Sequence, residues 1–66
     1  MSIRVNYTTL QEIVIAHRNG NIEWAMTEIK KLRRADRARI VGVFHSRAGA
    51  NVAFEIADKI IMADFK

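Results

Sequence analysis

The chain has 66 residues, a formal net charge of +4 and a pI of about 10.1, and it contains no cysteine. Without cysteine there is neither a disulfide nor a thiolate-held metal, so packing or a second copy of the chain must supply the stability. No apolar run approaches the roughly eighteen residues that a membrane span needs, and no signal-like segment opens the chain. We therefore expect a single small domain over residues 1–66, located in the cytoplasm, with no membrane contact.

The central feature of the sequence is a predicted helical hairpin over residues 9–19 and 21–34. Gly20 is a natural helix end, because glycine turns left-handed without steric cost. An Asn-Gly pair between apolar residues also occurs in β-hairpins, but the helical period on both sides favours helices. The spacing before the first helix is that of a capping box: Thr8 with Gln11, and Thr9 with Glu12. The apolar stripes comprise Leu10, Ile13, Val14, Ile22, Ala25, Met26, Ile29 and Leu32, with His17 at the edge.

The remaining segments allow two architectures. Residues 2–7 alternate between apolar and polar side chains, and residues 39–45 are rich in β-branched residues, so these stretches could form paired strands in an α+β fold. The second stretch also fits a helix over about 36–47 capped by Asp36, followed by a loop at Ser46–Ala50 and a helix over about 51–63. We predict the all-α fold, a small bundle built on the hairpin, because the chain has nine alanines and no proline.

Positive charge is concentrated in one short block of the sequence. Six of the eleven lysines and arginines fall within residues 30–39, where Asp36 is the only acid. These cations are Lys30, Lys31, Arg33, Arg34, Arg37 and Arg39. Such a block can neutralise the phosphates of a nucleic acid or bind an acidic protein surface. The plain alternative is a solvated helix end and linker.

Tryptophan and histidine are two further candidates for function. Trp24 lies off the apolar stripe of its helix and is a candidate hot spot for a protein partner, unless it covers the rim of the core. His17 and His45 have no acid spaced to orient them as catalytic bases, although His45 adjoins Ser46. No group of ligating residues has metal-site spacing. We therefore predict no catalytic activity, no cofactor and no metal.

The first half of the chain resembles the ribbon–helix–helix repressors. The features that carry this resemblance are the alternating segment Ser2–Tyr7 and the hairpin that turns at Gly20, within residues 2–34. In that family, the strands of two chains pair, and their outward side chains enter the major groove of DNA. The resemblance implies a homodimer in which Ser2, Arg4 and Asn6 read DNA.

A second resemblance, over residues 22–60, is to the Hha/YmoA family of small helical modulators of nucleoid silencing. It rests on Ile22, Ile29, Val43, Phe44, Ser46, Ala48, Val52, Ala53 and Lys59. Members of that family dock on a DNA-binding partner. The resemblance therefore implies a helical protein that acts in complex with a larger one.

Together these features predict a small basic regulatory protein that binds a macromolecule. The leading hypothesis is a nucleic-acid-binding regulator of transcription that uses the cations of residues 30–39, with Arg4 as a further contact. The alternative is a protein-directed adaptor or inhibitor, of the kind that phages and plasmids encode, which docks on a larger partner through Trp24 and the helix over 21–34.

Overall fold

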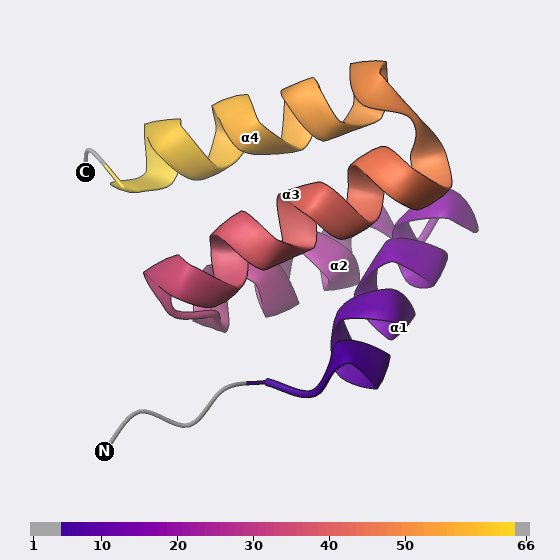
Figure 1. Cartoon of the computed structure of the whole chain (residues 1–66), viewed down its shortest axis with the longest axis horizontal. Coiled ribbons are helices and arrows are strands. Elements are labelled where there is room, and N and C mark those ends of the chain that lie inside the picture. The colour runs from indigo at the N-terminus through magenta and orange to yellow at the C-terminus, as the bar shows by residue number, and fades with distance from the viewer. Residues whose placement is uncertain (1–4, 65–66) are drawn as a thin grey trace.

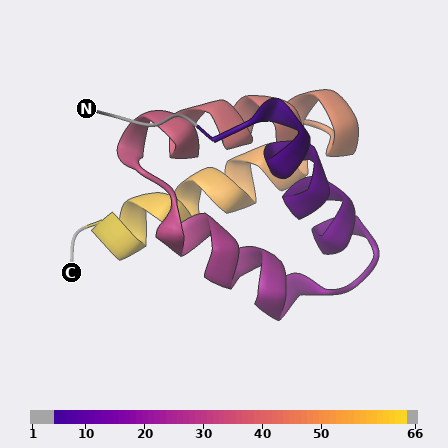
Figure 2. The same cartoon turned by 90° about the horizontal axis from the view of Figure 1, so that it is seen from below.

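The computed structural model describes residues 5–64, and within them the chain forms four helices joined by short connections (Figure 1). The helices are α1 (Tyr7–Arg18), α2 (Ile22–Lys31), α3 (Arg34–Ala48) and α4 (Ala50–Asp64). The predicted all-α fold is confirmed. Figure 2 shows α2, α3 and α4 running back and forth along the molecule, with α1 lying across one end.

The alternative α+β fold is wrong for the residues that the structure describes. Residues 39–45 lie inside α3, because their apolar side chains fall on one helical face, where Ile40, Val43 and Phe44 are buried. Burial of that face outweighs the strand preference of β-branched residues. The other proposed strand ends at Tyr7, which is already the first residue of α1, and its residues 2–4 lie outside the described range.

The predicted helical hairpin is present as α1 and α2, and Gly20 turns the chain between them with a φ of +94°. The predicted capping box is absent, because α1 begins earlier than predicted. Its N-cap is Asn6, whose side chain makes no cap hydrogen bond, so Thr8 and Thr9 lie within the first turn. The helical period located the hairpin correctly, while the start signal misplaced its first turn.

The connection between α2 and α3 differs from the prediction that the second helix reaches residue 34. The helix α2 ends at Lys31, and Leu32 adopts an extended backbone that places its side chain in the core, where it is 9% exposed. Arg33 is also extended and is the N-cap of α3, so Arg34 belongs to the next helix. Burial of one leucine thus redirects the chain and divides the basic block between two helices.

The turn between α3 and α4 is tighter than the predicted loop at Ser46–Ala50. The helix α3 continues through Ala48, and only Gly49 separates it from α4. Gly49 has a φ of +96°, a conformation that glycine adopts readily and that other residues rarely adopt. The short turn makes α3 and α4 neighbours along most of their length, and α4 packs chiefly on α3.

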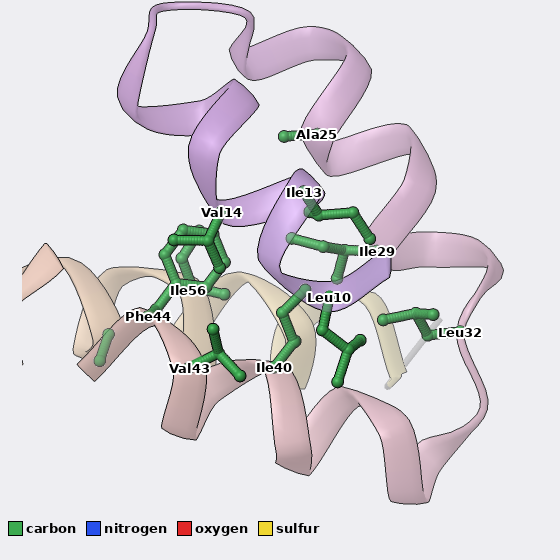
Figure 3. Close-up of a cluster of buried hydrophobic side chains, with 11 residues drawn as sticks. Leu10, Ile13, Val14, Ala25, Ile29, Leu32, Ile40, Val43, Phe44 and Ile56 are labelled. Atoms are coloured by element: carbon green, nitrogen blue, oxygen red, sulfur yellow. The ribbon is translucent and has the colours of Figure 1, made fainter. Parts of the chain in front are cut away.

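The core is a cluster of apolar side chains drawn from every helix (Figure 3). Its largest fully buried apolar members are Phe44, Leu10, Ile13, Ile29, Ile40, Ile56 and Val14. The predicted stripe of α1 is confirmed, because Leu10, Ile13 and Val14 are buried. At its edge, the ring of His17 packs edge-on against Phe44, with 5.2 Å between the ring centroids. Ile22 was predicted to face the core but is 45% exposed. It is the first residue of α2.

Candidate nucleic-acid interface

The connection between α2 and α3 carries four exposed cations within five residues. Lys30 and Lys31 end α2, Arg33 is the N-cap of α3, and Arg34 is the first residue of α3. We call these residues the basic corner. The corner lies at the opposite end of α3 from the α3–α4 turn (Figure 1). It presents a concentrated positive charge to solvent from one end of the molecule.

The helix dipoles stabilise one pair of cations in the basic corner and destabilise the other. Lys30 and Lys31 lie at the C-terminal end of α2, where positive charge is stabilising. Arg33 and Arg34 lie at the N-terminal end of α3, where the dipole opposes positive charge. The side chain of the N-cap residue Arg33 makes no cap hydrogen bond, and the amide groups of the first turn add to the positive potential. Two arginines beside such amides form a surface that attracts oxyanions.

Acidic groups reduce this positive potential only in part. Lys31 Nζ lies 3.1 Å from Glu28 Oε2 in an ion pair whose lysine side chain is 68% exposed. Asp36 lies in the first turn of α3, but its side chain is 2% exposed and faces the interior. The outward surface of the corner therefore remains cationic.

The last two cations of the predicted cluster are turned inward. Arg37 donates from Nη2 to the backbone oxygen of Lys30 at 3.0 Å, so it ties the start of α3 to the end of α2. Arg39 donates from Nη1 to Asp36 Oδ1 at 2.7 Å and to the backbone oxygen of Val5 at 2.9 Å. The structure thus brings together Lys30, Lys31, Arg33 and Arg34 at the surface and uses Arg37 and Arg39 for internal contacts.

Asp36 and Arg39 together hold the segment that precedes α1. Asp36 Oδ2 accepts a hydrogen bond from the backbone N–H of Val5 at 3.3 Å, while Arg39 donates to the carbonyl of the same residue. Both backbone groups of Val5 are therefore bound by one ion pair on α3. We call this arrangement the Val5 clamp. Asp36 was predicted to cap a helix over 36–47; it lies instead in the first turn of α3, which begins at Arg34, and is part of this clamp.

The Val5 clamp is the feature that sequence reasoning missed. An acid followed three positions later by a base is a recognisable helical pair. Its burial is not visible in the sequence, because it depends on where the segment before α1 crosses α3. Arg4, which was predicted to contact a partner, lies outside the described residues.

Trp24 is 43% exposed, as its position off the apolar stripe predicted. It lines an open hollow of about 450 Å³ on the outer side of α1 and α2. The other residues of this Trp24 hollow are Glu12, Ile15, Ala16, Asn19 and Asn21. Ile15 is 45% exposed, so two large apolar side chains are accessible here. None of the cations of the basic corner lines the Trp24 hollow.

Other chemistry has little support in the described part of the chain. His17 packs on Phe44, and His45 is exposed near the end of α3. Among the described residues, no three His, Cys, Asp or Glu side chains are grouped as a metal site requires. None of the helices within residues 5–64 combines the length and the apolar character that crossing a membrane needs.

Comparisons with protein-family models, with curated proteins and with solved structures find no match to this chain. The resemblances to ribbon–helix–helix repressors and to the Hha/YmoA family gain no support from them and stay predictions. Function must therefore be inferred from the chain's own surface.

Proposed function

We propose that this chain is a small regulatory protein that binds nucleic acid through the basic corner. The observation that carries the proposal is that four exposed cations lie within five residues at the connection between α2 and α3. Nucleic acids present a regular array of phosphates, and cations that neutralise them release condensed counterions, which drives binding. The net charge of +4 adds a favourable long-range attraction.

The side chains of the basic corner favour contacts with the nucleic-acid backbone over recognition of the bases. Its side chains are lysines and arginines on a short connection, and such groups position a protein on phosphates without reporting sequence. We therefore expect modest sequence preference for this surface alone. A transcriptional regulator built this way would gain specificity from DNA shape or from a second protein.

The test is a binding titration of a fluorescently labelled DNA duplex, followed by anisotropy at several salt concentrations. If all four cations contact phosphates, log Kd should rise with log salt with a slope of about 3 to 4. The double variant Arg33→Glu/Arg34→Glu should weaken binding at low salt by about tenfold or more and lower the slope by about two.

The matched control is Arg18→Glu/Arg47→Glu, which removes the same amount of charge from exposed positions outside the corner. It should lose much less affinity, because only the general attraction changes. Absence of DNA and RNA binding at low salt would refute the proposal. An equal loss in both double variants would show that net charge, and not the corner, is responsible.

A second candidate function is a protein-directed adaptor or inhibitor, and the Trp24 hollow favours it. Exposed tryptophans beside accessible apolar surface are frequent hot spots in protein interfaces. In a pull-down from nuclease-treated lysate, Trp24→Ala should abolish retention of a protein partner. The Arg33→Glu/Arg34→Glu variant should still retain that partner. The reverse pattern would favour the basic corner as the functional surface.

Self-association fits either function, and α4 offers a surface for it. Phe54 and Ile61 are 66% and 50% exposed and lie seven residues apart, hence on one face of the helix, with Met62 beside them at 68%. We propose that two chains pair through this face of α4. Sedimentation should report a dimer for the parent chain and a monomer for Ile61→Glu.

A further inference from the structure

A second hollow, unrelated to the basic corner, lies between α1 and α3. Its volume is about 300 Å³, and it is lined by Tyr7, Leu10, Arg39, Gly42, Val43 and Ser46. We call it the Arg39 hollow. Leu10 and Val43 are buried and form an apolar floor, while the other lining residues include a guanidinium and two hydroxyl groups. An apolar floor with a few converging polar groups is the usual composition of a small-ligand site.

The guanidinium of Arg39 is held so that one edge is available to a ligand. Both of its hydrogen bonds run from Nη1, to Asp36 and to Val5. Within residues 5–64, Nη2 and Nε of Arg39 have no protein acceptor, and its side chain is 35% exposed. The edge formed by these two nitrogens matches the two oxygens of a carboxylate or phosphate. The Val5 clamp fixes the plane of this fork, so little entropy is lost when an anion binds.

The hydroxyl groups of Tyr7 and Ser46 extend the same polar rim. Across the part of the chain that the structure describes, neither forms a hydrogen bond with another protein group. Tyr7 is 52% exposed, and Ser46 is exposed on α3. No carboxylate of residues 5–64 lines the hollow. The rim therefore presents donors, and Asp36, the acid paired with Arg39, is bound through Nη1.

Gly42 leaves the backbone of α3 accessible where it lines the hollow. It lies in the middle of α3 with a backbone conformation that needs no glycine, and glycine weakens a helix interior relative to alanine. A Cβ atom placed there would meet nothing within 4 Å. The backbone at Gly42 is therefore open beside the hollow, and a ligand can approach it closely.

We propose that the Arg39 hollow binds a small organic oxyanion, a carboxylate or phosphate monoester carried on an apolar body. The oxyanion would lie on the free edge of Arg39 and accept hydrogen bonds from Tyr7 and Ser46. The apolar body would lie over Leu10 and Val43, in the space that Gly42 leaves open. This site is separate from the basic corner and does not depend on nucleic-acid binding.

The test is a titration of the ¹⁵N-labelled chain with benzoate, phenyl phosphate, acetate and inorganic phosphate, followed by amide chemical shifts. Shifts should concentrate in residues 39–46 and saturate in the millimolar range or below. The apolar body should make benzoate and phenyl phosphate bind about tenfold tighter than acetate and inorganic phosphate. Comparison of the two aromatic ligands decides between carboxylate and phosphate as the preferred group.

The decisive variant is Gly42→Leu, which fills the hollow and leaves residue 39 an arginine. It should abolish binding, while the thermal melting point stays equal or rises because leucine favours helix. Ala38→Leu is the matched control, since it places the same side chain on α3 in a different groove; binding should persist. Tyr7→Phe and Ser46→Ala should each weaken binding by a few fold.

Three results would overturn the proposal. One is the absence of saturable shifts with any of the four ligands. Another is binding that survives Gly42→Leu, which would show that the shifts arise outside the hollow. The last is equal affinity for inorganic phosphate and phenyl phosphate together with loss of binding in Arg33→Glu/Arg34→Glu, which would assign the anion to the basic corner.

Discussion

The two parts of the basic block, residues 30–34 and 37–39, both consist mainly of cations but have opposite roles in the structure. The four cations of the first part are exposed at the connection between α2 and α3. The second part forms internal hydrogen bonds, from Arg37 to the end of α2 and from Arg39 to Asp36 and Val5. Nearness in sequence therefore does not make these cations one surface.

The difference arises from where each residue falls on α3. Arg39 lies three residues after the buried Asp36, and this spacing places both side chains on neighbouring parts of one helix face. Arg33 and Arg34 precede that face at the helix start, where nothing in the described chain covers them. Substitutions can separate a stabilising role from a binding role, because the inward cations should affect folding and the outward ones should affect binding.

The largest expected effect on the free energy of unfolding comes from removing the inward cation Arg39. Arg39→Met keeps an apolar stem but removes the guanidinium that neutralises the buried Asp36 and binds the carbonyl of Val5. Loss of one partner from a buried ion pair costs about 3 kcal/mol, toward the lower end here because Arg39 is 35% exposed. Urea unfolding measures the loss, and hydrogen exchange at the Val5 amide should accelerate as the clamp opens.

Arg34→Met is the matched control, because it removes an outward arginine from the same helix. Its free energy of unfolding should stay within about 0.5 kcal/mol of the parent value. Equal destabilisation by Arg34→Met and Arg39→Met would contradict the division of the block. A double-mutant cycle with Asp36→Asn should show coupling of about 1 kcal/mol or more between Asp36 and Arg39.

An intermediate effect is expected at Arg37. Arg37→Met removes the hydrogen bond from Nη2 to the carbonyl of Lys30, which satisfies one of the free carbonyls at the end of α2. A hydrogen bond from a charged donor contributes about 1.5 kcal/mol, so the melting point should fall by about 6 °C or more. Lys30→Met leaves the same backbone carbonyl in place and should be nearly neutral. If Lys30→Met is as destabilising, the lysine side chain and not the Arg37 contact stabilises the connection.

Periodicity was sufficient to predict the helical hairpin and its core positions, while composition favoured helix over strand for residues 39–45. The positions Leu10, Ile13 and Val14 repeat with the helical period, and all three are buried. The same logic placed Trp24 outside the core, where it is 43% exposed. These predictions succeed because helix burial depends mainly on which face a residue occupies.

Connections and charge placement could not be predicted in the same way. The end of α2 depends on the burial of Leu32, and the role of Asp36 depends on where Val5 crosses α3. Both are tertiary contacts that no local pattern encodes. The candidate site was therefore predicted as one block of six cations, and the structure reduces its exposed part to the basic corner.

The smallest expected effect on folding is the one that best isolates binding. Arg33 is the N-cap of α3 and makes no cap hydrogen bond, although serine is among the residues preferred there. Arg33→Ser should therefore raise the free energy of unfolding by about 0.5 to 1 kcal/mol, through a new cap and removal of charge opposed by the dipole. The same change should weaken DNA binding and lower the salt slope by about one. Arg33→Lys retains the charge and should leave both quantities nearly unchanged. If arginine at position 33 lowers stability but raises affinity, it serves binding. A loss of stability in Arg33→Ser would instead assign Arg33 a structural role.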